Sequence, residues 1–221
     1  MTELLRQQMI DTALAMNASG LNQGTSGNLS ARCEDGFLIT PSGMEYAGLS
    51  TSDIVWMDVE GKTRGARKPS SEWRFHAAIY QHRPEANAIL HAHPVSCSTL
   101  ACLNRGIPAF HYMVAVAGGR DIRCADYATF GTPELSEHVL KALQDRKACL
   151  MAHHGLTCFE KDLPRALALA IEVEHLATVY GRILAIGEAE ILTDDEMDLV
   201  LKKFSNYGVQ AQDWGQSEVP G

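Results

Sequence analysis

The sequence predicts a three-layer α/β/α domain with a central, mostly antiparallel sheet. Three short apolar or alternating runs, at about 29–33, 37–40 and 54–59, are separated only by turn signals such as PSG and DVEGK. Strands joined by turns pair antiparallel, whereas βαβ units would need a helix in each connection. Segments with helical periodicity before and after these runs supply the two outer layers.

The remaining elements follow from apolar spacing and from residues that start or stop helices. Apolar residues over 4–14 recur near helical spacing, and Gly20 is well placed to end that helix. In PSSEWRFH, a serine cap and an early acid predict a helix from about Ser71 to His82. Helices are predicted at about 2–19, 71–82, 95–103, 133–144, 164–186 and 194–205, and further strands at about 86–93, 148–153 and 156–159.

Length and composition limit the class of protein. The 221 residues, 46% hydrophobic and 21% charged, predict one domain over 1–221, including a tail at about 208–221 that could be flexible. A formal net charge of −8 argues against a nucleic-acid surface, which needs clustered Lys and Arg. Charges throughout MTELLRQQMIDTALAM argue against a signal peptide or membrane span, so we expect a cytoplasmic protein with no membrane partner.

Two of the nine histidines, His91 and His93, stand two apart in the apolar run ANAILHAH. In a strand, residues i and i+2 project from the same face, so the two imidazoles would lie together and suit one metal ion. Taken alone, such a pair could equally cap the end of a sheet. The histidines in predicted helices are assigned to structure or to solvent: His76, His82, His138 and His175.

A second pair, His153 and His154 in MAHHGL, ends another apolar strand and precedes Gly155, which lets the backbone approach a neighbour closely. Adjacent strand residues face opposite ways, so only one of the two can point at a shared metal, and spacing does not choose between them. Three imidazoles with an open fourth position are typical of catalytic zinc, whereas magnesium and calcium prefer oxygen ligands.

Three segments of small residues could bind an anion together: GTSGN at 24–28, SG at 42–43, and SS at 70–71. Backbone N–H groups in glycine turns form anion sites, and a helix N-terminus adds its dipole, so phosphate is the expected ligand. Glu72 follows directly and would stand near both the phosphate and the metal. In isolation it would only favour the helix dipole, but beside zinc it becomes a candidate base.

The chain resembles the class II aldolase and adducin-head family through motifs in the family's order: GTSGNLS, ITPSGMEY, KPSSEWRFHAAIY, ILHAHP and MAHHGL. The resemblance runs from about residue 3 to 207. Four segments are most similar to members that cleave L-fuculose 1-phosphate: PSSEWRFH, IPAFHYMVAVAGG, YATFGTPELSEH and HHGL. It implies the family's α/β/α fold and a zinc-dependent aldehyde-lyase that reversibly yields dihydroxyacetone phosphate and L-lactaldehyde.

The same resemblance assigns roles to individual residues. It implies one zinc ion per subunit with three imidazole ligands, His91, His93 and His154. It makes Glu72 the base and a displaceable metal ligand. It also implies a homotetramer in which Tyr112, a catalytic residue, enters the neighbouring subunit's site. The substrate-binding residues are then Thr25, with Asn28, Ser42, Gly43, Ser70 and Ser71 at the phosphate, and Phe130 and Tyr207 on the aldehyde side.

Three other functions stay open. A pentulose-phosphate 4-epimerase of the same family would be more similar in segments like PSSD and HADY, which here read PSSE and HYMV. An aldolase or dehydratase acting on a 5-deoxy- or methylthio-pentulose 1-phosphate is poorly distinguished by the motifs. A non-enzymatic, adducin-like scaffold would have no reason to keep three metal ligands and a base.

Overall fold

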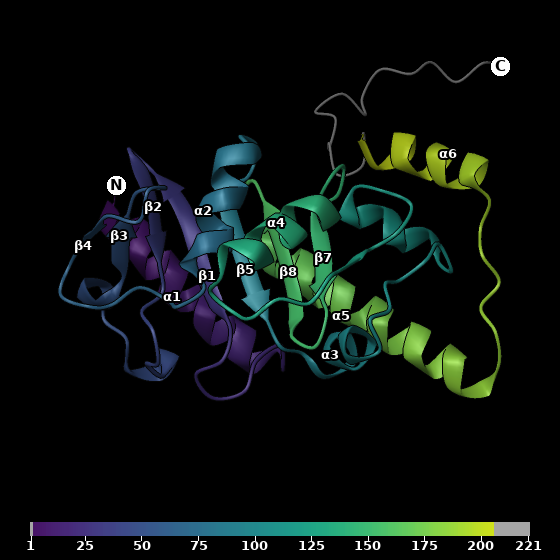
Figure 1. The fold of residues 1–221 in the computed structure, drawn as a ribbon, viewed down its shortest axis with the longest axis horizontal. Coiled ribbons are helices and arrows are strands. Elements are labelled where there is room, and N and C mark those ends of the chain that lie inside the picture. The colour runs from purple at the N-terminus through teal and green to yellow at the C-terminus, as the bar shows by residue number, and fades with distance from the viewer. Residues whose placement is uncertain (1, 206–221) are drawn as a thin grey trace, which may run out of the picture.

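The computed structural model describes residues 2–205, which contain one eight-stranded sheet with helices on both faces (Figure 1). The strands are β1 (Asn28–Cys33), β2 (Gly36–Ile39), β3 (Val55–Met57), β4 (Thr63–Arg64), β5 (Ala88–Ala92), β6 (Cys124–Ala125), β7 (Ala148–Met151) and β8 (Gly155–Glu160). The strand order is β4-β3-β2-β1-β5-β8-β7-β6. Only the β6–β7 pair is parallel among these strands, which confirms the mostly antiparallel sheet.

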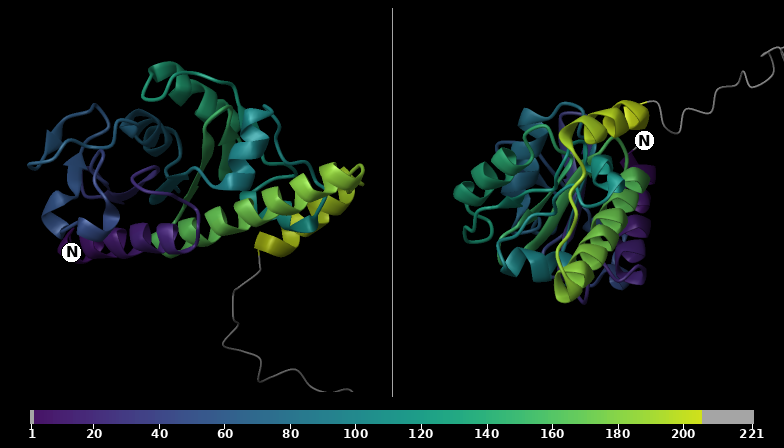
Figure 2. Two further views of the ribbon diagram at one scale, coloured as in Figure 1. Left: turned by 90° about the horizontal axis from the view of Figure 1, so that it is seen from below. Right: turned by 90° about the vertical axis from the view of Figure 1, so that its right-hand side faces the viewer.

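Helices cover both faces of the sheet (Figure 2). They are α1 (Thr2–Ala18), α2 (Trp73–His82), α3 (Val95–Cys102), α4 (Pro133–Ala142), α5 (Leu163–Ile186) and α6 (Asp194–Ser205). Successive residues of β5 point to opposite faces, as strand geometry requires. Leu90 packs in a buried cluster with residues of α1, α3 and α5. Ile89 packs in a second cluster with residues of α2 and α4. The three-layer α/β/α prediction is therefore confirmed.

Most predicted elements are present, with differences of a few residues at their ends. β7 ends at Met151, before the predicted end, because His153 has a left-handed backbone (φ 55°) that turns the chain. The two-residue strands β4 and β6 were not predicted, since two residues show no periodicity. No helix among residues 2–205 is long and apolar enough to cross a membrane. The predicted tail at 208–221 lies outside the described residues.

The prediction of a serine cap on α2 was wrong. The helix begins at Trp73 with Glu72 at the N-cap position, and no side chain caps it there. The Oγ of Ser70 instead accepts a hydrogen bond from the backbone N–H of Glu72 over 3.3 Å. Ser71 is exposed. The serines therefore form a turn before the helix, and this turn points the Glu72 carboxylate toward the sheet.

Candidate active site and metal centre

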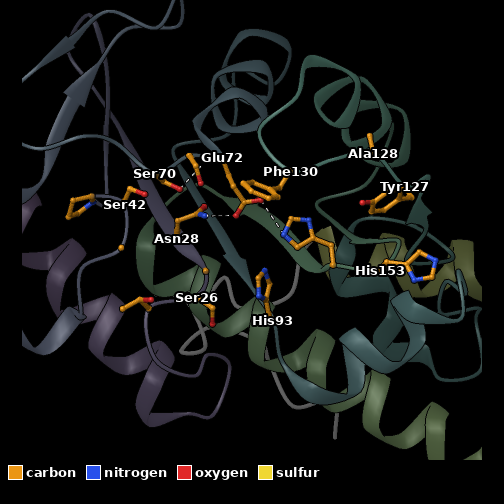
Figure 3. Close-up of a pocket in the computed structure, with 16 residues that line it drawn as sticks. Ser26, Asn28, Ser42, Ser70, Glu72, His93, Tyr127, Ala128, Phe130 and His153 are labelled. Carbon is orange, nitrogen blue, oxygen red and sulfur yellow. Dashed lines mark hydrogen bonds and ion pairs between the residues drawn. The ribbon is translucent and has the colours of Figure 1, made fainter.

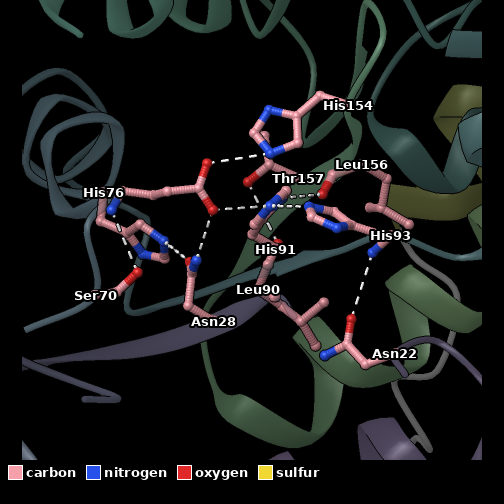
Figure 4. Close-up of polar contacts among 12 residues, drawn as sticks. Asn22, Asn28, Ser70, His76, Leu90, His91, His93, His154, Leu156 and Thr157 are labelled. Atoms are coloured by element: carbon pink, nitrogen blue, oxygen red, sulfur yellow. Dashed lines mark hydrogen bonds and ion pairs between the residues drawn. The ribbon is translucent and has the colours of Figure 1, made fainter. Parts of the chain in front are cut away.

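Four side chains from three parts of the fold meet beside the N-terminus of α2. They are Glu72 at the N-cap of α2, His91 in β5, His93 just beyond β5, and His154 in the turn between β7 and β8. One ligand atom from each lies within 4.8 Å of the others, and Figure 4 shows the three histidines close together. We call these residues the four-residue cluster. They are the three histidines and the acid that the resemblance assigned to the metal.

The atoms in the cluster face one another at short range. The Nε2 atoms of His91 and His93 are 2.9 Å apart. Each carboxylate oxygen of Glu72 lies near a different imidazole. Oε2 is 3.1 Å from Nε2 of His91, and Oε1 is 3.1 Å from Nε2 of His154. His91 is fully buried and Glu72 is buried. The four groups therefore converge on one small volume.

Hydrogen bonding around the cluster indicates that a cation fits this volume. His91 Nδ1 donates to the carbonyl oxygen of Leu156 over 2.8 Å, which leaves Nε2 as the ring nitrogen that can bind a metal. Nε2 of His91 faces the Glu72 carboxylate oxygen Oε2 over 3.1 Å. Glu72 Oε1 is buried and accepts no hydrogen bond within residues 2–205. Three imidazole nitrogens and one carboxylate oxygen are a donor set typical of zinc.

The pKa shifts in the cluster favour the forms that bind metals. Burial raises the pKa of Glu72, but the adjacent His91 and His154 lower it by more, so that the pKa lies well below its usual range. Burial, and then the neighbouring imidazoles, lower the pKa of His93 to about 4. At neutral pH, Glu72 is therefore a carboxylate and His93 a neutral imidazole, as metal binding requires.

Geometry distinguishes between the two adjacent histidines that spacing could not separate. His154 belongs to the four-residue cluster, whereas His153 does not. The left-handed backbone of His153 directs its ring to the edge of Tyr127, with ring centroids 5.8 Å apart. Gly155 is needed behind them, because a Cβ atom there would lie 2.4 Å from the carbonyl oxygen of Ala92 and 2.9 Å from the His93 ring.

The cluster borders a cavity of about 400 Å³ (Figure 3). The three small-residue segments of the sequence, around 25–28, 42–43 and 70–71, all line this cavity. The predicted site residues along this cavity are Thr25, Asn28, Ser42, Gly43, Ser70, Ser71, Glu72, His93, Phe130 and His154. Ser26 and Gly27 of the predicted GTSGN segment and His153 of the second histidine pair also line it, and so does Tyr127, which sequence reasoning missed. No sequence signal pointed to Tyr127 as a site residue.

The cavity wall offers hydrogen-bond donors without positive charge. Glu72 is its one acidic group, and no Lys or Arg lines it among the described residues. Gly27 has a left-handed backbone (φ 75°), and a Cβ atom there would lie 2.5 Å from the Asn22 side chain and 2.7 Å from the His91 carbonyl oxygen. Glycine is therefore required for this close approach. Turns of this kind expose backbone N–H groups that can bind an anion.

Tyr112, predicted as a catalytic residue, lies away from the cavity of its own chain. Tyr112 begins a 3₁₀ segment, η3 (Tyr112–Ala117), is half exposed and does not line the cavity. Its ring neighbours are His111 and Phe204. Tyr207 lies outside the described residues. Within one chain, therefore, the cavity has no tyrosine from η3.

The histidines assigned to structure or solvent lie outside the cluster. His82 is exposed and His138 is half-buried, and each faces a backbone carbonyl oxygen, of Ala78 and Asp126 respectively. His175 is exposed. His76 is fully buried and contacts Asn28 and Ser30.

Comparisons with known proteins agree with this geometry. Residues 7–180 match the Class II Aldolase and Adducin N-terminal domain. A 5-methylthioribulose-1-phosphate/5-deoxyribulose-1-phosphate aldolase from Rhodospirillum rubrum is 57% identical over 208 residues, 94% of each chain. An L-fuculose phosphate aldolase from Escherichia coli K12 is 54% identical over 210 residues, 95% of this chain and 98% of the relative.

A solved structure described as L-fuculose 1-phosphate aldolase superposes with a TM-score of 0.88 at 41% sequence identity, covering 91% of this chain and 96% of that one. The match in sequence and in fold spans the three segments that build the cavity and the four-residue cluster. This chain belongs to the class II aldolase and adducin N-terminal domain family and is an aldehyde-lyase within it.

Proposed function

We propose that this aldolase reversibly cleaves a ketose 1-phosphate to dihydroxyacetone phosphate and a short aldehyde, with L-fuculose 1-phosphate as the first candidate. One observation carries the proposal: the four-residue cluster and the uncharged, donor-rich segments border the same cavity. A phosphate bound by Asn28, Ser42, Gly43, Ser70 and Ser71 would hold the donor half of the substrate beside Glu72.

The metal in this proposal is one zinc ion per chain, held by His91, His93 and His154. When bound, zinc would supply Lewis-acid stabilisation of the negative charge that develops on the donor's oxygens. The support is the donor set itself, together with the buried carboxylate oxygen that has no hydrogen-bond partner in the described part of the chain.

Glu72 would move the proton at the donor carbon. In condensation, its carboxylate removes a proton from the hydroxymethyl carbon of dihydroxyacetone phosphate. In cleavage, the carbon–carbon bond between donor and aldehyde breaks, the aldehyde forms its carbonyl group, and the Glu72 carboxyl returns the proton to the donor carbon. The ionised state of Glu72 and its place at the cavity wall support this role.

The aldehyde oxygen needs a proton partner, and we propose Tyr112 of a neighbouring copy in a homotetramer. Within one chain, Tyr112 is half exposed and stands away from its own cavity. In a site between subunits, this exposed side chain would reach the cavity of the neighbouring copy. We also propose a cytoplasmic location, because the charge on a sugar phosphate keeps it from crossing a bilayer unaided.

A second substrate is favoured by a specific observation. The relative from Rhodospirillum rubrum is named for 5-methylthioribulose 1-phosphate and 5-deoxyribulose 1-phosphate. These sugars share the 1-phosphate with L-fuculose 1-phosphate and also end in an apolar group. Tyr127 and Phe130 expose 59% and 63% of their surface and line the cavity, so their rings could contact that group.

Aldehyde release decides between these possibilities. The zinc-loaded protein should be assayed with L-fuculose 1-phosphate, 5-deoxyribulose 1-phosphate, 5-methylthioribulose 1-phosphate and L-ribulose 5-phosphate. We expect aldehyde and dihydroxyacetone phosphate from at least one 1-phosphate, and the largest kcat/KM identifies the preferred sugar. Epimerisation of L-ribulose 5-phosphate without cleavage of any 1-phosphate would overturn the proposal.

A further inference from the structure

A line of buried polar side chains runs from the interior of the protein to Glu72. His76 Nδ1 is 2.7 Å from Ser30 Oγ, and His76 Nε2 is 2.6 Å from Asn28 Oδ1. Asn28 Nδ2 then donates to Glu72 Oε2 over 2.9 Å (Figure 3). We call Ser30, His76, Asn28 and Glu72 the positioning chain. Ser30 and His76 are fully buried, and Asn28 and Glu72 are 3% and 7% exposed.

The spacing of these residues follows from a match between a strand and a helix. Asn28 and Ser30 are two apart in β1, so they project from the same face about 6.6 Å apart along the strand. Glu72 and His76 are four apart at the start of α2, which places them on one helical face about 6 Å apart. Because the two steps are nearly equal, side chains from the helix and the strand can alternate along one line.

The donors and acceptors in the positioning chain can be ordered in one direction only. Glu72 is ionised and can only accept, so Asn28 must present its NH₂ group to it. The Asn28 oxygen therefore faces His76, and Nε2 of His76 must carry a proton. The Nδ1 atom of a neutral imidazole is then bare, and Ser30 must donate to it. Burial lowers the pKa of His76 to about 3, so the ring is neutral at physiological pH.

Two further contacts hold the ring and leave the direction unchanged. Phe75 stacks on His76, with ring centroids 4.5 Å apart and an interplanar angle of 27°. The Tyr80 hydroxyl lies 2.8 Å from Ser30 Oγ on the side away from Glu72. Without this hydroxyl, Ser30 could still donate to His76. Tyr80 therefore stands behind the positioning chain and does not set its direction.

We infer that His76 is a positioning residue for the reaction: its Nε2–H fixes the orientation of the Asn28 amide, and that amide holds the Glu72 carboxylate in place for proton transfer. The inference rests on the proposed role of Glu72. If His76 took the other tautomer, Asn28 would turn its amide over and present its oxygen to the carboxylate. Two acceptors would then face each other, and Glu72 would move away from the position that it holds beside His91.

A buried network that serves only stability makes a different prediction. In that case, removing any of its hydrogen bonds should lower the melting temperature and leave turnover per folded molecule unchanged. A directed chain instead makes turnover depend on which bond is lost. Three variants of the protein make this comparison. His76→Leu and His76→Gln change the positioning chain, and Tyr80→Phe is the control outside it.

The three variants should separate. His76→Leu leaves the Asn28 oxygen without a donor, so kcat should fall about 10-fold or more, the usual effect of losing a hydrogen bond that acts on a charged group. His76→Gln keeps an N–H group near the position of Nε2 and should recover most of this loss. Tyr80→Phe loses a buried hydrogen bond but should keep turnover close to that of the unchanged protein. Zinc content and melting temperature are measured for all three.

A second measurement determines the direction of the hydrogen bonds in the positioning chain without using activity. In zinc-loaded protein labelled with ¹⁵N-histidine, the His76 resonances, assigned by their loss in His76→Gln, should show a protonated Nε2 and a bare Nδ1. A protonated Nδ1 would overturn the inference. Equal kcat values for His76→Leu and Tyr80→Phe at full zinc content would overturn it as well.

The experiment also separates failure of this inference from failure of the proposed function. Glu72→Gln is assayed beside the other variants. If it keeps normal turnover, the proposed base is wrong, and the catalytic half of the inference is overturned with it. If Glu72→Gln is impaired while His76→Leu is not, the base stands and only the positioning role of His76 is overturned.

Discussion

Oε1 of Glu72 lies 3.1 Å from Nε2 of His154, yet this buried oxygen accepts no hydrogen bond from any group in residues 2–205. An unpartnered, buried carboxylate oxygen costs free energy unless a cation or a donor meets it. The groups around this oxygen are imidazole nitrogens. The Nδ1 atom of His91 already donates to a backbone carbonyl oxygen. A metal ion bound between the two residues best explains this arrangement.

His154→Ala should bind zinc much more weakly than the unchanged protein, because two imidazoles cannot hold the ion as three do. His153→Ala is the matched control, since its ring lies one residue away and outside the cluster. After dialysis against a weak chelator, metal analysis should find one zinc per chain in the unchanged protein and in His153→Ala, and little in His154→Ala. Loss of zinc from His153→Ala alone would reverse the assignment.

Ser71→Ala should lower kcat/KM for the phosphorylated ketose about 10- to 150-fold, the range expected when one hydrogen bond to a charged group is lost. Because Ser71 is exposed and does not cap α2, the melting temperature should not change. Ser70 is buried and accepts a bond from the Glu72 N–H, so Ser70→Ala should also destabilise the protein. Equal losses by Ser71→Ala on phosphorylated and unphosphorylated ketose would contradict a phosphate contact.

The sequence predicted the elements of the fold well where periodicity was long. It missed the two-residue strands β4 and β6, and it placed a serine cap where Glu72 holds the N-cap. A two-residue strand is defined by its hydrogen bonds to a neighbouring strand, and two residues are too few to show a periodic pattern. Ser-Ser-Glu before an apolar run is compatible with either a cap or a turn, and tertiary contacts decide which one forms.

For the site, spacing predicted that His91 and His93 would lie together, because both projections follow from strand geometry. Spacing could not choose between His153 and His154. The choice depends on the left-handed backbone of His153, and the sequence does not mark this conformation at a histidine. The support for Glu72 from His76 was also missed, since it requires knowing that α2 lies against β1.

Tyr112→Phe should impair the step at the aldehyde oxygen and leave hydrogen exchange at the donor carbon intact, because that exchange needs only the cluster and the phosphate site. Mixing tests whether Tyr112 acts between subunits. When Tyr112→Phe and His154→Ala chains are unfolded and refolded together, cleavage should recover, because some sites combine intact ligands with an intact tyrosine from the neighbour. No recovery in confirmed mixed oligomers would indicate that Tyr112 acts within its own chain or not at all.

The free energy of unfolding should fall as pH drops from about 6.5 toward 3, in part because of His76. Burial lowers its folded pKa from 6.5 to about 3, so in this range the unfolded chain binds a proton that the folded chain does not. Stability therefore rises with pH, by at most about 1.4 kcal/mol per pH unit from this one group. His76→Gln cannot titrate, so denaturant titrations should show a shallower pH dependence. Identical slopes would contradict a neutral, buried His76.

Hydrogen exchange into dihydroxyacetone phosphate tests the proposed role of Glu72 most directly, because it reports proton removal without the aldehyde. The zinc-loaded protein should exchange the hydroxymethyl proton with deuterated water. Glu72→Gln should keep its zinc through three imidazoles and lose roughly 10²–10⁴-fold in exchange rate, the usual contribution of a positioned base. Exchange at the normal rate by Glu72→Gln with one zinc per chain would show that another group removes the proton.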